Sequence, residues 1–145
     1  MPSDRFSHTV DVAAPSAAVW QALQSAETWK GIGPIDRVWD AVNDPDGNLA
    51  GYRWSATAAG RQWEGTARRT ALDPGRSLRL DLDSSEIVGA IEVSVAPGGS
   101  SRLTVTLEAS PKGVLATVFW GVAREALRRG LDDHVEEFAR RFSPT

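Results

Sequence analysis

The stretch of sequence that decides the fold lies near the start of the chain and reads VDVAAPSAAVWQAL over residues 10–23. It ends a strand pattern, because apolar and polar residues alternate through Phe6–Val12, as in a strand that buries one face. Pro15 then occupies a favourable first position for a helix, where its fixed φ suits the first turn. Apolar residues recur at helical spacing as far as Leu23. The sequence therefore predicts a strand followed directly by a short amphipathic helix over Pro15–Gln24.

The rest of the chain predicts a second short helix, six more strands and a long helix. Ser25 is a favourable capping residue for the second short helix, which extends to Trp29. The strands alternate apolar and polar residues and are bounded by turn signals, of which Asn43–Asn48 is a strong one. They are expected at Asp36–Val42, Leu49–Ala58, Arg61–Leu72, Leu78–Leu82, Ile87–Val95 and Leu103–Leu107. Because no helix lies between these strands, their short connections require an antiparallel meander.

The last predicted element is a helix over Gly113–Phe142, a segment without proline that opens after a cap at Ser110-Pro111. Gly121 and Gly130 weaken it and are expected to bend it. An apolar stripe runs along its second half, at Leu127, Leu131, Val135, Phe138 and Phe142. Its first part, Gly113–Ala123, is apolar nearly all round, which is typical of a helix buried on every side. We expect this part to be wrapped by strands and loops, to form a dimer surface, or to act as a cavity gate that touches membrane.

Together these elements predict an α+β architecture in which residues 1–145 form a single domain. A seven-stranded antiparallel sheet twists and curls, and the long C-terminal helix is the only element available to cover its concave face. One helix is about 10 Å wide and leaves space beneath a broad sheet. Space lined by apolar and aromatic side chains is the default hypothesis for a ligand site.

Composition excludes several classes of function. The net charge is −3 and no long basic run exists, which argues against a nucleic-acid partner. Cysteine is absent and the two histidines lie far apart, so no metal and no cofactor is expected. The sequence has no apolar segment near the ~20 residues of a membrane-spanning helix and no secretory signal pattern. We therefore expect a cytoplasmic protein without stable membrane insertion.

A family resemblance is carried by Val10-x-Val12-x-Ala14-Pro15, followed by Val19-Trp20, Leu23 and Trp29, and by the order of the elements. This pattern resembles the START-like, or helix-grip, superfamily (SRPBCC), which includes polyketide cyclases and dehydratases, lipid-transfer domains and the birch-pollen allergen type. The resemblance covers essentially the whole chain. It implies a hydrophobic cavity between sheet and helix that binds lipids, polyketides or other bulky apolar molecules. It does not choose among these activities, because its motifs are mostly core positions.

Tryptophan is the unusual feature of the composition, with six residues beside one tyrosine and four phenylalanines. Trp20 is expected to be scaffold, and Trp29 to lie near a cavity mouth. The residues expected to line the cavity are Trp39, Trp54, Trp63 and Trp120. The alternative is ordinary core and cross-strand packing. Small residues beside the indoles favour a cavity, because a packed core would fill their positions; they are Ala56, Ala58, Gly65 and Ala67.

Three polar residues are candidates for orienting a ligand. His8 falls by alternation on the apolar face of the first strand, either as a satisfied core histidine or as a cavity group able to move protons. Tyr52 shares a strand face with Trp54. Arg69 is solvated, or points inward with Trp63 to pair with a glutamate or hold a ligand carboxylate. The other histidine, on the last helix, is expected at the surface.

Three functions remain open on this sequence. The first is binding of a hydrophobic small molecule in a tryptophan-lined cavity between sheet and helix. Its candidate contacts are His8, Trp29, Trp39, Tyr52, Trp54, Trp63, Arg69 and Trp120. The second is a polyketide cyclase- or dehydratase-like enzyme that holds a reactive chain folded, with His8 or Tyr52 moving protons. The third is a non-enzymatic interaction module that forms a homodimer through the apolar half of the last helix.

Overall fold

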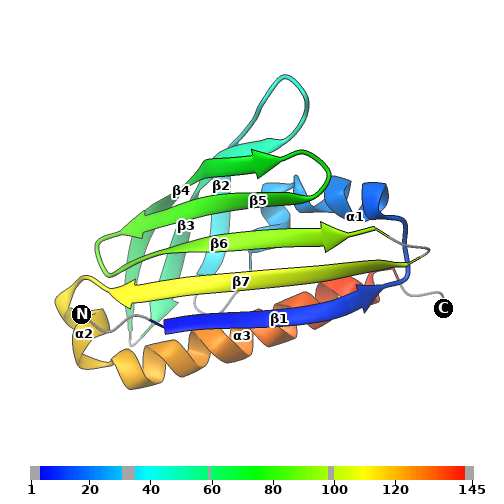
Figure 1. Cartoon of the computed structure of the whole chain (residues 1–145). Coiled ribbons are helices and arrows are strands. Elements are labelled where there is room, and N and C mark those ends of the chain that lie inside the picture. Colours follow the sequence, from blue (N-terminus) through cyan, green and yellow to red (C-terminus); the bar gives the residue numbers. More distant parts are fainter. Residues whose placement is uncertain (1–3, 31–34, 59, 98–99, 143–145) are drawn as a thin grey trace.

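The order of helices and strands follows the predicted order closely. The computed structural model describes residues 4–30, 35–58, 60–97 and 100–142. Its elements are β1 (Asp4–Val12), α1 (Ser16–Leu23), the 3₁₀ helix η1 (Ala26–Trp29), β2 (Ile35–Asn43), β3 (Leu49–Ala58), β4 (Arg61–Asp73), β5 (Ser77–Ser84), β6 (Ile87–Ala96), β7 (Ser101–Pro111), α2 (Val114–Val118) and α3 (Trp120–Arg140). Figure 1 shows their arrangement.

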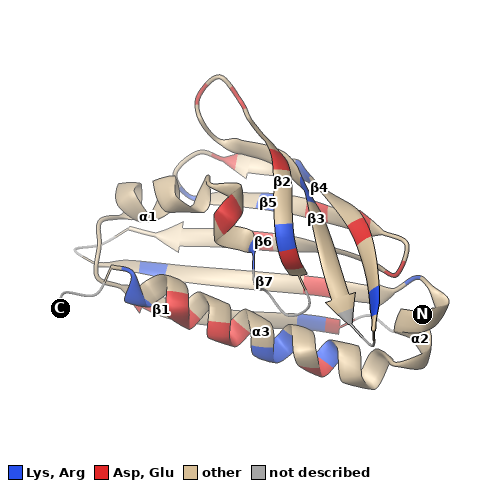
Figure 2. Ribbon diagram, turned by 180° about the vertical axis from the view of Figure 1, so that it is seen from behind, with Lys and Arg blue, Asp and Glu red and all other residues tan. Residues whose placement is uncertain are grey.

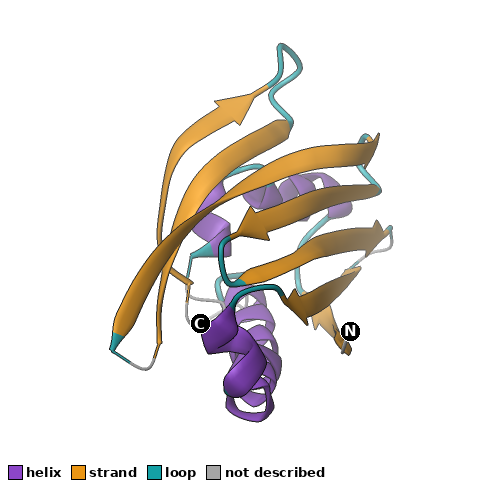
Figure 3. Ribbon diagram, turned by 90° about the vertical axis from the view of Figure 1, so that its left-hand side faces the viewer, coloured by secondary structure: helices purple, strands orange, loops and turns teal. Residues whose placement is uncertain are grey.

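The seven strands form one antiparallel sheet in the order β1-β7-β6-β5-β4-β3-β2. Strands β2 to β7 make the predicted meander, and β1 completes the sheet beside β7. The sheet curves, and α3 runs along its concave side against β1 and β7 (Figure 3). Helix α1 packs on β6, and η1 packs on β2 and β3. The predicted α+β helix-grip fold is confirmed.

The core lies between the concave face of the sheet and these helices. Alternate residues of each strand turn inward, as in Leu103, Val105 and Leu107 of β7, which are all buried. The predicted apolar stripe of α3 meets them, with Leu131 fully buried. Phe142 extends this packing, because its ring lies edge-on to that of Phe138 at 5.3 Å between centroids.

The prediction of one continuous last helix is wrong at one point. Ser110 and Pro111 still belong to β7, and the helical segment that follows is divided at Phe119 into α2 and α3. The division falls beside Gly121 but not at it. Next to the break, the indole Nε1 of Trp120 donates a hydrogen bond to Asp4 Oδ2 at 2.7 Å. This bond joins the start of α3 to the start of β1.

Helix α2 is held at its own start by Glu86, from the turn between β5 and β6. The carboxylate of Glu86 accepts the backbone N–H of Ala116 at 2.9 Å, and its carbonyl oxygen accepts those of Lys112 and Gly113. A Cβ atom on Gly113 would overlap the Glu86 carboxylate. The absence of a side chain at Gly113 thus allows the Glu86 carboxylate to lie against this position.

His134 on α3 is half-buried and links this helix to η1, so its predicted place at the surface is corrected. Its Nε2 hydrogen-bonds to the carbonyl oxygen of Thr28, which makes Nε2 the donor. Burial lowers the pKa of His134, the bond to Thr28 acts in the opposite direction, and the positive charge of Arg141 lowers it further.

We expect His134→Gln to make the free energy of unfolding fall less steeply as the pH is lowered below 7. Since the folded pKa of His134 lies below the unfolded value near 6.5, the unfolded chain takes up this proton first as the pH falls. The contribution of neutral His134 is therefore complete above about pH 6.5 and is lost as the pH drops toward the folded pKa. Urea unfolding of both proteins between pH 7.5 and 5 measures this, and an unchanged slope in the variant would contradict the assignment.

Candidate functional site

Strands β3 and β4 bring three of the candidate residues onto the concave face of the sheet. Trp54 lies opposite Gly65, and Trp63 lies opposite Ala56, in pairs that are two positions apart in the ladder and therefore share one face. Tyr52 lies two positions further along β3 on the same face. Tyr52 and Trp54 are buried, with exposed fractions of 4% and 2%, and Trp63 is half-buried. The structure thus places these three side chains in the interior beneath α3.

The interior beside the two indoles contains a small enclosed cavity of about 20 Å³. Its lining residues are Ile35, Trp54, Ala56, Trp63, Leu82, Ile87, Leu107, Glu108, Ala109 and Leu127. A cavity of this volume holds about one water molecule. Leu127 of α3 reaches into it from the helix side, so a larger molecule could enter only if Leu127 and its neighbours moved.

Three buried donors in this region have no hydrogen-bond partner among the described residues: Tyr52 Oη, Trp54 Nε1 and Trp63 Nε1. By contrast, the buried indoles of Trp20 and Trp29 are satisfied, by Asn48 Oδ1 at 2.9 Å and by the Leu23 carbonyl at 3.3 Å respectively. A buried donor without a partner costs about 1–3 kcal/mol. The interior is therefore complementary to a molecule that brings hydrogen-bond acceptors.

Tyr52 can act as a hydrogen-bond donor in this setting. Desolvation by burial raises the pKa of Tyr52 well above its ordinary value near 10. The phenol stays protonated at neutral pH, and its hydroxyl is a donor rather than a base.

The small residue Gly65 does not mark empty space, contrary to the prediction. A Cβ atom at this position would lie 2.5 Å from Trp54 Cε2 and 2.5 Å from the carbonyl oxygen of Asp83. The indole of Trp54 therefore occupies the space above Gly65. This close packing across β3 and β4 explains part of the small size of the cavity.

Trp39 does not line the interior, and its prediction as a cavity residue is corrected. It lies opposite Arg53 in the ladder, on the outer face of the sheet, whereas its neighbour Val38 points inward opposite Trp54. The guanidinium of Arg37 stacks over the Trp39 ring at 4.6 Å. Register shifts interrupt the pairing of β2 on both sides of Trp39.

His8 faces α3 rather than the cavity. Its Nε2 lies 2.8 Å from Glu136 Oε1, and its Nδ1 lies 3.3 Å from Asp132 Oδ1. The side chain is 25% exposed. Both ring nitrogens are thus engaged by the helix, so His8 joins β1 to α3 and does not meet Tyr52 in a shared site.

Arg69 points inward but is already occupied. Its Nη1 donates to Asp44 Oδ2 at 2.9 Å and to the carbonyl oxygen of Leu49 at 3.2 Å. The carboxylate of Asp44 also accepts the backbone N–H of Asn48 at 3.0 Å. These bonds, led by that from Asn48, lower the pKa of Asp44. Arg69 therefore anchors the turn between β2 and β3, and its partner is this aspartate rather than a glutamate.

Trp29 and Trp120 take structural positions. Trp29 is 1% exposed within the core under η1, and Trp120 is held by Asp4 at the start of α3. Neither residue lines the enclosed cavity.

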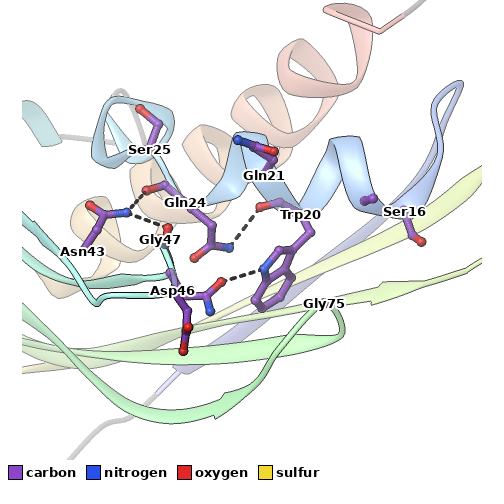
Figure 4. Close-up of a pocket in the computed structure, with 11 residues that line it drawn as sticks. Ser16, Trp20, Gln21, Gln24, Ser25, Asn43, Asp46, Gly47 and Gly75 are labelled. Atoms are coloured by element: carbon purple, nitrogen blue, oxygen red, sulfur yellow. Dashed lines mark hydrogen bonds between the residues drawn. The ribbon is translucent and has the colours of Figure 1, made fainter.

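A second hollow, which the sequence did not predict, is an open groove of about 570 Å³ beside α1 (Figure 4). Its lining residues are Ser16, Ala17, Trp20, Gln21, Gln24, Ser25, Asn43, Asp46, Gly47, Asn48 and Gly75. Its amides are engaged in holding the fold: Gln24 bonds the Trp20 carbonyl and the Leu49 N–H, and Asn43 bonds the carbonyls of Gln24 and Gly47. The groove therefore reflects the junction of α1 with the turn between β2 and β3.

Two further features bear on the chemistry of the molecule. Within residues 4–30, 35–58, 60–97 and 100–142, no cluster of three or more His, Asp or Glu side chains is suited to hold a metal ion. None of the helices in these ranges is long and apolar enough to span a bilayer.

This arrangement of a curved seven-stranded sheet gripped by a C-terminal helix defines the START-like class of fold. A START superfamily protein from Mycobacterium smegmatis has 21% identity and a TM-score of 0.63, over 92% of this chain and 97% of that one. The Zhui aromatase/cyclase from Streptomyces sp. R1128 has 20% identity and a TM-score of 0.71, over 97% and 95%. A conserved protein from Geobacillus kaustophilus has 12% identity and a TM-score of 0.72, over 96% and 95%. These identities establish likeness of fold alone.

The family follows from the sequence itself. The profile of the family described as polyketide cyclase / dehydrase and lipid transport matches residues 3–143. The chain belongs to this family. No curated protein matches the sequence significantly.

Proposed function

We propose that this chain binds an apolar small molecule that carries at least one hydrogen-bond acceptor, in the interior between β3, β4 and α3. The observation that supports this most is the pair of buried, unpartnered indole donors of Trp54 and Trp63 beside the enclosed cavity. An acceptor placed between them would remove the cost of two unsatisfied donors. Tyr52 would supply a third donor further along β3.

Binding on this proposal requires the interior to open. The cavity of about 20 Å³ is far below the roughly 300–1,000 Å³ of drug-sized ligand sites. Leu127 is the only cavity-lining residue contributed by a helix. A shift of α3 away from β3 and β4 would withdraw this side chain, and the ligand would take the space that it leaves.

The test compares 9-fluorenone with fluorene, which have nearly the same shape and differ in one carbonyl acceptor. In ¹H–¹⁵N spectra of the six indole N–H groups, we expect fluorenone to shift the resonances of Trp54 and Trp63. We expect fluorenone to bind about tenfold more tightly than fluorene, since one hydrogen bond from a buried donor is worth about 1–1.5 kcal/mol.

Variants assign this effect to particular donors. Trp54→Phe and Trp63→Phe should each abolish most of the preference for fluorenone, because phenylalanine keeps an aromatic ring and removes the N–H. Trp39→Phe is the matched control on the outer face and should leave both affinities unchanged. Equal binding of the two probes, or shifts confined to the other four indoles, would refute the proposal.

A further inference from the structure

Helix α2 and the first turn of α3 carry a concentration of exposed apolar side chains. Val114, Val118, Phe119 and Val122 have exposed fractions of 79%, 66%, 50% and 73%. Val114 and Val118 lie one turn apart on α2, and Phe119 and Val122 follow at the junction and in the first turn of α3. We name these four residues the α2 face. Beside it lies an open groove of about 260 Å³, lined by Arg61, Glu86, Val114, Leu115, Val118 and Phe119.

Such a concentration of exposed apolar side chains is unusual for a surface in contact with water. The other large apolar residues exposed among the described residues, Val42 and Val88, stand singly on separate strands. Single exposed valines are ordinary, whereas contiguous apolar patches mark sites that contact another apolar surface. The α2 face is therefore a candidate surface for contact with another apolar surface.

The size of the α2 face argues against a second copy of the chain as that apolar surface. A stable protein interface takes about 20–30 residues from each partner. The α2 face offers four large side chains on a short, narrow helical segment at one end of the molecule (Figure 1). A lipid surface needs no such area, because an amphipathic segment sinks its apolar side chains only about 5–10 Å into the boundary between headgroups and acyl chains.

One cation beside the α2 face, Arg61, is available to anionic headgroups. Arg61, on the rim of the groove, takes part in no ion pair among the described residues. Lys112 and Arg124 flank the face on either side in sequence, each held by one aspartate, and α2 itself carries no charge (Figure 2). One carboxylate, that of Glu86, lines the groove and is engaged by the backbone N–H of Ala116. Further acidic residues, Asp132, Asp133, Glu136 and Glu137, lie on the second half of α3.

We propose that the α2 face docks on an anionic lipid surface, with Val114, Val118, Phe119 and Val122 inserted at the headgroup–acyl boundary and Arg61 against lipid phosphates. This docking stands on the exposed residues and does not require a bound ligand. The purpose of the docking rests on the proposed function. The groove and the cavity are neighbours in sequence, because Trp63 of the cavity lies two residues from Arg61 of the groove and Ile87 of the cavity adjoins Glu86 of the groove. An apolar ligand would then pass from lipid to the interior at this end of the molecule.

The experiment is cosedimentation of the full chain with vesicles, without added ligand. Vesicles of phosphatidylcholine with 30% phosphatidylglycerol are compared with phosphatidylcholine alone. The variant Val118→Ser/Val122→Ser removes half of the α2 face at exposed positions, where the fold does not depend on the side chains. Val42→Ser is the matched control, since Val42 is 59% exposed on β2, away from α2.

We expect wild type and Val42→Ser to bind the anionic vesicles alike, and the double variant to bind at least tenfold more weakly, since burial of each valine is worth roughly a factor of ten. Arg61→Gln should reduce the preference for anionic over neutral vesicles. Melting temperatures equal to that of wild type verify that the variants fold.

Three results would overturn the docking proposal. One is no binding of wild type at millimolar lipid, and another is equal binding by the double variant. The third is a wild-type dimer in sedimentation velocity that Val118→Ser/Val122→Ser dissociates, which would assign the face to a second copy. Failure of the proposed function is distinguished from failure of the docking proposal, because the titration of the indole N–H groups with fluorenone contains no vesicles.

Discussion

Replacement of Leu127 by alanine is expected to lower the free energy of unfolding by about 3 kcal/mol, the middle of the range for leucine-to-alanine changes in packed cores. Leu127 is 4% exposed and lines the enclosed cavity from α3. The change removes buried apolar surface and enlarges a space that already exists between the helix and the indoles of Trp54 and Trp63. Urea unfolding with the linear extrapolation measures the loss.

The same variant separates a cavity effect from a general loss of packing. Leu131→Ala, one helical turn further along α3, is the matched control, because Leu131 is fully buried and does not line the cavity. Both variants should be destabilised to a similar extent. Only Leu127→Ala should regain stability when 9-fluorenone is added, since a ligand that binds the folded state shifts the unfolding equilibrium. Recovery of both variants, or of neither, would contradict a site at this position.

The second large effect is expected for Gly65→Ala, which should destabilise the protein by about 2–3 kcal/mol, as overpacking of a tight core does. The new methyl group would overlap the Trp54 indole and the Asp83 carbonyl oxygen, so one of the two must move. Thermal unfolding measures the loss, and the Trp54 indole resonance should shift strongly because its ring is displaced.

Gly121→Ala provides the control for this substitution. A Cβ atom at Gly121 meets no atom within 4 Å, and the residue lies within α3. Alanine in an exposed helix is worth roughly 0.5–1 kcal/mol over glycine, so this variant should be slightly more stable than wild type. An equal loss of stability in both variants would show that the environment of Gly65 has been misread.

The fold could be predicted because its determinants are local. Alternation of apolar and polar residues marks each strand. The helical pattern after Pro15 separates the first strand from β2, and no helical pattern occurs again until after β7. The long helix, however, was predicted as one piece. The bond from Trp120 to Asp4 beside the break joins residues 116 positions apart and has no signature in the sequence.

The site could be predicted only in part, because it depends on which way each side chain faces. Regular alternation correctly grouped Trp54 with Tyr52, and Trp63 with Arg69. The prediction of Trp39 as a cavity residue was wrong, in a strand where bulges interrupt the pairing and Asp40 takes a positive φ of 53°. Those bulges depend on contacts with β3, and a single strand does not reveal them.

The sequence also did not reveal which side chains pair with one another in the fold. The turn that carries Asp44 is brought to Arg69 by the pairing of β3 with β4, and the carboxylates that face His8 come from the opposite end of the chain. The small residues wrongly indicated empty space, for a similar reason. Gly65 is small because an indole from the next strand lies over it, and a list of residue sizes cannot distinguish that from a void.

The placement of β1 beside β7 has a consequence for the order in which the molecule assembles. The hydroxyls of Ser7 and Thr106 bond across this pair at 3.0 Å, although 99 positions separate them in sequence. During synthesis the first strand leaves the ribosome long before its partner, whereas the meander can form strand by strand. We expect β1 to join last, with slow folding typical of such non-local pairing. Until then β7 presents an open edge on which another unfinished chain can pair.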